Sequence, residues 1–148
     1  MRSEEEQIEV LLRGDLTGWV QEQIAFGKEM NDRTWYDFLS VTPEQVTAHA
    51  LARGFPVGAV WSPPQPPTEK NDRLVVEPAA DGAWRVYYTE RGEADDERRF
   101  ATREAAYRDA VDRVMNGAWV RLNHNYWAKH HREGDVFPAL GGALPPPR

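Results

Sequence analysis

Cysteine is absent from the 148-residue sequence. A structural disulfide, a thiolate zinc site and a thiol nucleophile are therefore excluded, and this composition suits a reducing compartment. Long hydrophobic runs are absent too, because no apolar stretch approaches the roughly 20 residues that a membrane-spanning helix needs. The first residues, 1–6, are acidic where a secretory signal has a basic start. We therefore expect a soluble, cytoplasmic protein that has no membrane partner.

An excess of basic residues is also missing. The chain has 18 Lys and Arg against 24 Asp and Glu, which gives a net charge of −6. Proteins that bind nucleic acid through its phosphates carry a basic surface, so we expect no nucleic-acid partner. A negative surface favours a cationic partner, although many ordinary soluble proteins carry a similar charge.

Enough apolar residues are present to build a core. They make up 41% of the chain, and six tryptophans are among them. At this length we expect one domain. It divides into a mainly helical part (1–61), a proline-rich connector (62–72), a β-meander with helices (73–134) and a C-terminal tail (135–148).

Helical spacing dominates the N-terminal half. Apolar residues three and four apart predict helices over 4–13 and from about 17 to about 30. A dense apolar patch at 35–39 fits either a helical turn or a short strand. The best-delimited helix lies between Thr42, which opens a capping box, and Gly54, which suits the left-handed position after a helix.

Strand patterns follow the connector. A β-branched run at 74–76, a turn at Asp81-Gly82 and the alternation over 84–89 predict the first two strands. The polar stretch 90–96 is expected to close a second hairpin, and 98–100 to return as a third strand. The sequence thus predicts an α+β fold, in which a small antiparallel sheet of three to four strands packs against helices.

The remaining pattern is helical and then irregular. Thr102 caps a helix to about Met115, and the spacing resumes from 118 to about 132 as a continuation or as a separate helix. Within the tail, the apolar residues of 136–140 can pack back onto the domain. The glycines and prolines beyond them predict a frayed end.

No catalytic constellation is present, so we predict no catalytic residue, no metal and no cofactor. His124, His130 and His131 lie on the last predicted helix, at spacings of six and seven. About 10 Å separates the first from the last along the helix axis, which is too far for one ion unless other ligands help. A solvated helix end is the favoured interpretation, and a metal-dependent enzyme is the alternative.

Two other features suit contact with another protein. The second hairpin carries Arg91 and many acidic residues that should face water; the acids are Glu90, Glu93, Asp95, Asp96 and Glu97. Trp61, beside the prolines, and Tyr87, on the strand face opposite Trp84, are candidate exposed anchors, because aromatic residues dominate interface hot spots. The prolines at 63–67 favour a surface spacer; the alternative is that the chain is a regulatory or adaptor module that uses them as a peptide ligand.

Residues 81–92 (DGAWRVYYTERG) and 100–106 (FATREAA) resemble a pattern in small bacterial immunity proteins, the partners of polymorphic or contact-dependent toxins. That pattern is a strand ending in a YYSERG-like run, a polar turn, a Phe, and a helix that opens with an acid and small residues. Thr89 stands where Ser is more familiar. The resemblance covers about 73–116, roughly a third of the chain. It implies an inhibitor without activity of its own that binds a cognate toxin domain and often occludes its active site.

Taken with this resemblance, the candidate residues form a predicted partner-binding surface. The acidic hairpin end would meet basic residues around the toxin's substrate cleft, and the aromatic residues would anchor the contact. The predicted surface consists of Trp61, Tyr87, Glu90, Arg91, Glu93, Asp95, Asp96 and Glu97.

Overall fold

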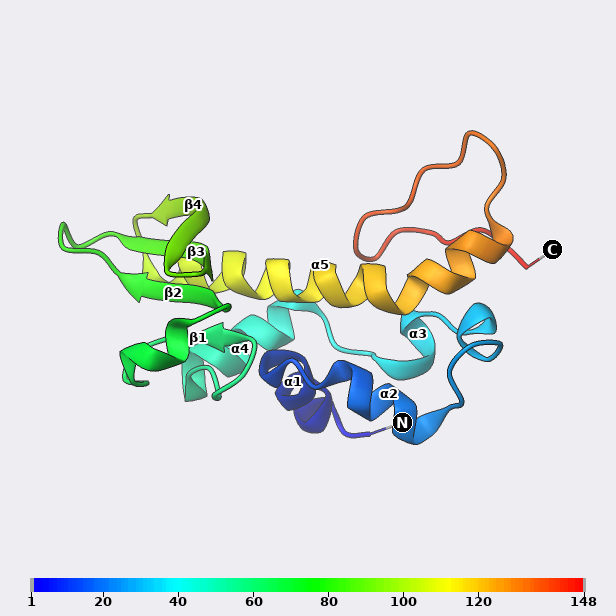
Figure 1. The fold of residues 1–148 in the computed structure, drawn as a ribbon, viewed down its shortest axis with the longest axis horizontal. Coiled ribbons are helices and arrows are strands. Elements are labelled where there is room, and N and C mark those ends of the chain that lie inside the picture. The colour runs from blue at the N-terminus through cyan, green and yellow to red at the C-terminus, as the bar shows by residue number, and fades with distance from the viewer. Residues whose placement is uncertain (1, 148) are drawn as a thin grey trace.

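A computed structural model describes residues 2–147 (Figure 1). The elements in chain order are α1 (Glu4–Arg13), α2 (Leu16–Gln23), η1 (Met30–Asp32), α3 (Trp35–Phe38), α4 (Pro43–Arg53), β1 (Val60–Trp61), η2 (Pro67–Lys70), β2 (Leu74–Pro78), β3 (Trp84–Glu90), β4 (Glu93–Phe100) and α5 (Arg103–His130). The predicted α+β fold is confirmed. Within the described part of the chain, no helix has the length and apolar character needed to cross a membrane.

Helix α5 is the axis of the molecule. Its 28 residues form one continuous helix, which resolves the alternative left open by the sequence. The sheet lies at its N-terminal end, α1 to α4 lie along one side, and the residues after it return along the other (Figure 1). Gly117 lies at an exposed position of α5, where an added Cβ would meet open space. The buried residues of the N-terminal helices, the sheet and α5 form a single core.

The four strands are ordered β1-β2-β3-β4. The pairs β2–β3 and β3–β4 are antiparallel as expected, but the two-residue strand β1 runs parallel to β2, so the sheet is mixed. Leu74, Val76 and Val86 belong to the main core with α5, whereas Trp61, Val75 and Tyr87 form a separate cluster. Because side chains alternate along a strand, this second cluster lies on the outer face of the sheet.

Local signals placed α4 correctly. The Thr42 hydroxyl accepts a hydrogen bond from the amide of Gln45 at 3.3 Å, the Gln45 side chain accepts one from the amide of Thr42 at 2.9 Å, and Gly54 follows with φ of 76°. The patch at 35–39 is a helical turn, α3. The second helix is shorter than predicted, because Ile24 is extended and ends α2 at Gln23.

The prediction that the C-terminal tail frays beyond Leu140 is wrong for residues 141–147. Trp119 and Tyr126 of α5 donate hydrogen bonds to carbonyl oxygens of the tail, and Phe137 and Leu140 pack against the core as expected. Val136 does not pack, since its exposed fraction is 83%. Aromatic donors on a distant part of the chain hold the tail, which composition alone could not indicate.

Candidate protein-binding site at the β3–β4 hairpin

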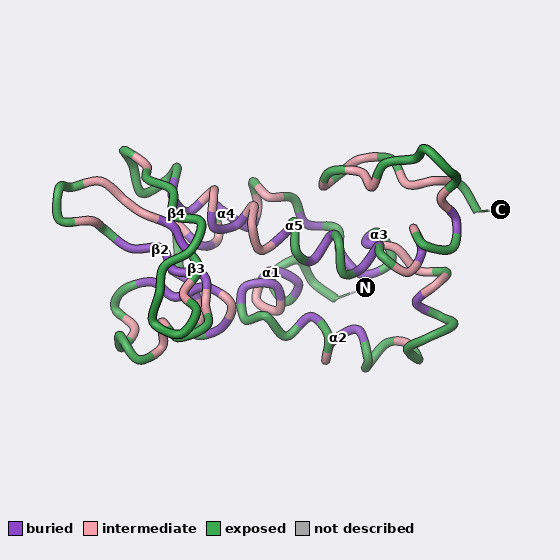
Figure 2. Tube along the Cα trace, turned by 45° about the horizontal axis from the view of Figure 1, so that its top comes forward, coloured by how far each residue is buried: buried purple, intermediate pink, exposed green. Residues whose placement is uncertain are grey.

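The polar stretch after β3 forms a much tighter turn than the sequence suggested. Arg91 (φ 51°) and Gly92 (φ 82°) are both left-handed, as a two-residue hairpin turn requires. Glu90 therefore pairs with Glu93, and β4 starts directly at Glu93. The acidic residues predicted for the turn belong instead to an exposed edge strand (Figure 2).

A bulge interrupts β4 at Asp96. Tyr88 pairs with Asp95 and Val86 pairs with Arg98, so two residues of β4 oppose Tyr87, and Asp96 takes a left-handed conformation with φ of 50°. Arg113 of α5 donates a hydrogen bond from Nη2 to the Asp96 carbonyl oxygen at 3.0 Å. The bulge thus presents a carbonyl group to α5.

Ion pairs extend this contact between the hairpin and α5. Asp109 accepts hydrogen bonds from Arg113 Nε at 3.0 Å and from Arg98 Nη1 at 2.9 Å. The Asp96 carboxylate lies 3.5 Å from Arg113 and 3.6 Å from Arg98. The Arg113 side chain is only 7% exposed, so this cluster is partly buried. Asp96, a predicted partner-binding residue, is therefore engaged within the chain.

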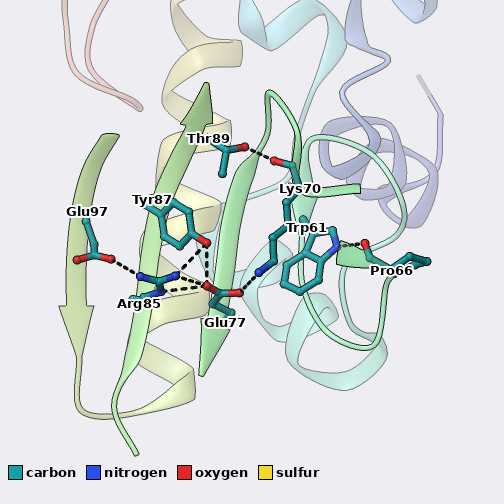
Figure 3. A network of polar contacts seen from close by, with 8 residues as sticks. All are labelled: Trp61, Pro66, Lys70, Glu77, Arg85, Tyr87, Thr89 and Glu97. Carbon is teal, nitrogen blue, oxygen red and sulfur yellow. Dashed lines mark hydrogen bonds and ion pairs between the residues drawn. The ribbon is translucent and has the colours of Figure 1, made fainter. Parts of the chain in front are cut away.

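Glu97 is engaged on the opposite face of the sheet. Its carboxylate accepts a hydrogen bond from Arg85 Nη1 at 2.9 Å. Arg85 also pairs with Glu77 at 2.6 Å, and Glu77 accepts a further hydrogen bond from the Tyr87 hydroxyl at 2.7 Å and pairs with Lys70 at 2.7 Å (Figure 3). This network spans β2, β3, β4 and the connector.

Both predicted aromatic anchors are buried on the outer face of the sheet. Trp61 and Tyr87 are each 4% exposed, so the expectation that they are exposed anchors is wrong. The Trp61 indole donates a hydrogen bond to the Pro66 carbonyl oxygen at 2.9 Å, and Lys70 Nζ lies 4.6 Å from the centre of the Trp61 ring (Figure 3). The connector therefore covers Trp61, and the Arg85 guanidinium lies over Tyr87, 4.5 Å from the centre of its ring.

Burial and hydrogen bonding shift the pKa values of Glu77 and Tyr87 in this network. Burial alone would raise the pKa of Glu77, but hydrogen bonds from Lys70, Tyr87 and Arg85 outweigh it and hold that pKa below its ordinary value. Burial, together with the neighbouring Glu77 carboxylate, raises the pKa of Tyr87 to about 12. The folded state therefore favours a charged Glu77 beside a neutral Tyr87.

A pH dependence follows from the raised pKa of Tyr87. The stability that it contributes is complete below the ordinary pKa of 10 and is lost as the pH rises toward about 12. We expect Tyr87→Phe to cost about 1 kcal/mol near neutral pH, through its lost hydrogen bond, and to lose less stability than the wild type above about pH 10. Urea denaturation from about pH 9 to 11.5 measures both effects.

The matched control is Tyr36→Phe, because Tyr36 is 55% exposed. Its stability curve should run parallel to that of the wild type over the same pH range. A parallel curve for Tyr87→Phe as well would show that the burial of this phenol contributes nothing to the alkaline loss of stability.

Three of the predicted acidic residues remain available. Within residues 2–147, Glu90, Glu93 and Asp95 form no ion pair and are exposed. Glu90 and Asp95 line a groove of about 880 Å³ between the hairpin, the α1–α2 junction and α5. Tyr88, on the same strand face, is 40% exposed and also lines the groove. It is the exposed aromatic residue of the hairpin, in place of Tyr87.

Sequence reasoning missed the opposite wall of the groove. It includes Asp72 and Arg73 before β2, together with Arg113 and Arg121 on α5. Among the described residues, neither Arg91 nor Arg121 forms an ion pair. The i, i+4, i+8 spacing of Arg113, Gly117 and Arg121 could have indicated a polar stripe on α5. Nothing local indicated that this stripe would face the hairpin.

The histidines on α5 do not converge. His124 is exposed beside a cavity between α2 and α5. The ring centres of His130 and Tyr126 lie 4.3 Å apart. His131, just after α5, stacks on Trp127 with ring centres 5.5 Å apart. Across residues 2–147, no group of three or more His, Cys, Asp or Glu side chains is placed to hold a metal ion.

The available chemistry at the hairpin is therefore recognition by charge and by an exposed ring. Glu90, Glu93 and Asp95 offer carboxylates, Arg91 and Arg121 offer guanidinium groups, and Tyr88 offers a ring. Comparison of the chain with models of protein families, with curated proteins and with solved structures found no match.

Proposed function

We propose that this chain is a cytoplasmic immunity protein that binds a cognate bacterial toxin domain and masks its active site. The observation that carries the proposal is the set of three exposed carboxylates without ion pairs, those of Glu90, Glu93 and Asp95, beside the exposed ring of Tyr88. They lie on a hairpin that the Arg98–Asp109 and Asp96–Arg113 ion pairs fasten to α5.

The attachment of this hairpin to α5 supports a role in binding. A partner that meets a backbone already folded avoids the entropy cost of ordering it. The unpaired carboxylates would attract the basic rim of a toxin cleft and raise the association rate, while contacts at Tyr88 would prolong the complex. Arg91 lies between Glu90 and Glu93 at the tip. A partner that buries its guanidinium group must place a hydrogen-bond acceptor opposite it, which contributes specificity.

Charge reversal tests the proposed surface. The double variant Glu90→Lys/Asp95→Lys should bind the toxin domain encoded beside this chain's gene with an association rate lowered about tenfold or more at low salt, and with a weaker dependence on ionic strength. Association rates measured at several salt concentrations give the result.

The control is Glu104→Lys/Glu133→Lys, which changes the net charge equally at two exposed positions of and beyond α5. It should retain most of the wild-type rate. An equal loss in both variants would mean that only net charge matters and that the proposed surface is wrong. Failure of the wild-type chain to bind the toxin domain would reject the function itself.

A further inference from the structure

The C-terminal tail, residues 135–147, is seated on α5 by aromatic side chains. Trp119 Nε1 donates a hydrogen bond to the Pro138 carbonyl oxygen at 3.0 Å, and the Tyr126 hydroxyl donates one to the Pro145 carbonyl oxygen at 2.8 Å. The rings of Trp127 and Phe137 lie 5.4 Å apart. We call Trp119, Tyr126 and Trp127 the aromatic face of α5.

This is the chemistry by which proteins recognise proline-rich peptides. Such peptides are extended and lack internal hydrogen bonds, and aromatic side chains hold them in a groove. The tail has the matching features. It contains four prolines, it has no helix or strand over its described residues, and two of its proline carbonyls accept hydrogen bonds from aromatic donors.

The tail covers a surface that would otherwise be strongly apolar. Trp119 is 2% exposed and Tyr126 is 8% exposed. The tail runs along the side of α5 opposite α1 and α2 (Figure 1). It folds back on itself at Gly141, whose φ is 84°, where the Gly142 amide donates a hydrogen bond to the Ala139 carbonyl oxygen at 2.8 Å. The tail therefore has two short arms, neither of which is helix or strand.

The tail does not fill the surface that it occupies. A cavity of about 580 Å³ continues from Leu140 past Trp119 and Tyr36 to Pro43. Tyr36 is 55% exposed, and its ring meets that of Trp119 edge-on at 5.9 Å. A ligand longer than the turn of the tail would find further aromatic surface there.

We propose that the aromatic face of α5 is a binding site for an extended proline-rich peptide of another protein, and that the tail is its resident occupant. A tethered segment competes at an effective concentration of about millimolar, so an external peptide binds weakly until the tail is displaced. A partner that also reaches the cavity beside Tyr36 gains contacts that the tail does not make.

A peptide with the sequence of residues 135–147 tests this site in the full-length chain. One variant carries Phe137→Gly/Leu140→Gly, which removes the two tail side chains that pack on the core. This variant should bind the free peptide at least tenfold more tightly than the wild-type chain. Adding Tyr126→Phe should then weaken that binding about fivefold, the effect of one lost hydrogen bond.

The matched control is the same peptide with Pro138→Ala, Pro145→Ala, Pro146→Ala and Pro147→Ala, which should bind severalfold more weakly because the extended conformation is less preorganised. Equal binding of the first peptide to the wild-type and variant chains would place it elsewhere and overturn the proposal. A dimer formed through the tails without peptide would assign the face to a second copy instead, and would likewise overturn it.

A second measurement does not depend on the variant folding. In the isotope-labelled wild-type chain, unlabelled peptide at several millimolar should move the amide signals of Gly141 and Gly142 to free-chain positions while the indole signal of Trp119 stays near its original position. Tail signals that remain unchanged at that concentration would contradict displacement.

Discussion

Asp109→Ala is expected to lower the free energy of unfolding by about 3–5 kcal/mol, which is a large part of the roughly 5–15 kcal/mol available to a domain. The Asp109 side chain is 11% exposed and that of Arg113 is 7% exposed. Removing the Asp109 carboxylate leaves the Arg113 guanidinium partly buried. Asp96, whose carboxylate lies 3.5 Å away, is then its remaining polar partner. Urea denaturation measures the change.

Two variants separate this effect from the loss of any surface ion pair. Asp112→Ala removes a partner of Arg108 that is 41% exposed, and it should cost less than about 1 kcal/mol. Asp109→Leu/Arg113→Met replaces the buried pair by apolar side chains and should recover most of the lost stability. Similar costs for Asp109→Ala and Asp112→Ala would show that Asp109 does not fasten the hairpin to α5.

Trp119→Ala should have an effect of similar size, about 3–5 kcal/mol, because it removes one of the largest fully buried side chains. The Trp119 ring lies 5.7 Å from that of Trp35, and its indole holds the tail through Pro138. The variant therefore weakens the core between α3 and α5 and also the attachment of the tail. Denaturant unfolding reports the first, and amide exchange at 139–142 reports the second.

Trp119→Phe distinguishes the two contributions. It keeps an aromatic ring in the core but removes the indole donor, so we expect it to retain more stability than the alanine variant while amide exchange in the tail still accelerates. Unchanged exchange in the tail of Trp119→Phe would mean that the hydrogen bond to Pro138 does not hold the tail.

The parts of the fold that the sequence predicted are those specified by neighbouring residues. The helix α4 is set by Thr42, Pro43 and Gln45 at its start and by Gly54 at its end, and all four act within one turn of the helix ends. The α5-facing side of β3 follows from simple alternation over 84–88. These signals need no knowledge of distant segments.

The hairpin was predicted less well, because β4 is an edge strand. Its side chains can face water on both faces of the sheet, so residues 93–96 show no apolar alternation. Their pattern therefore predicts a turn. The groove combines Glu90 and Asp95 with Asp72 and Arg121, which lie far from them in the sequence. A groove of this kind exists only after the chain has folded.

The buried aromatic residues of the outer face illustrate the same limit. Trp61 is covered because the connector folds back beside it, and Tyr87 is covered by Arg85, so Glu77 receives its three donors in a protected position. Composition favours an extended stretch here, but residues 63–65 form a turn and a bend, and Pro67–Lys70 is a short 3-10 helix. Composition could not indicate which face of the sheet the stretch would cover.

The bulge at Asp96 also limits how other chains can approach the sheet. The open edge of β4 would otherwise present a regular row of main-chain groups on which a strand of another molecule could grow, as in fibrils. The left-handed Asp96 interrupts that row, and charged side chains lie on β4 both before and after it. Self-association by strand addition is therefore disfavoured at this edge, and recognition there must proceed through side chains.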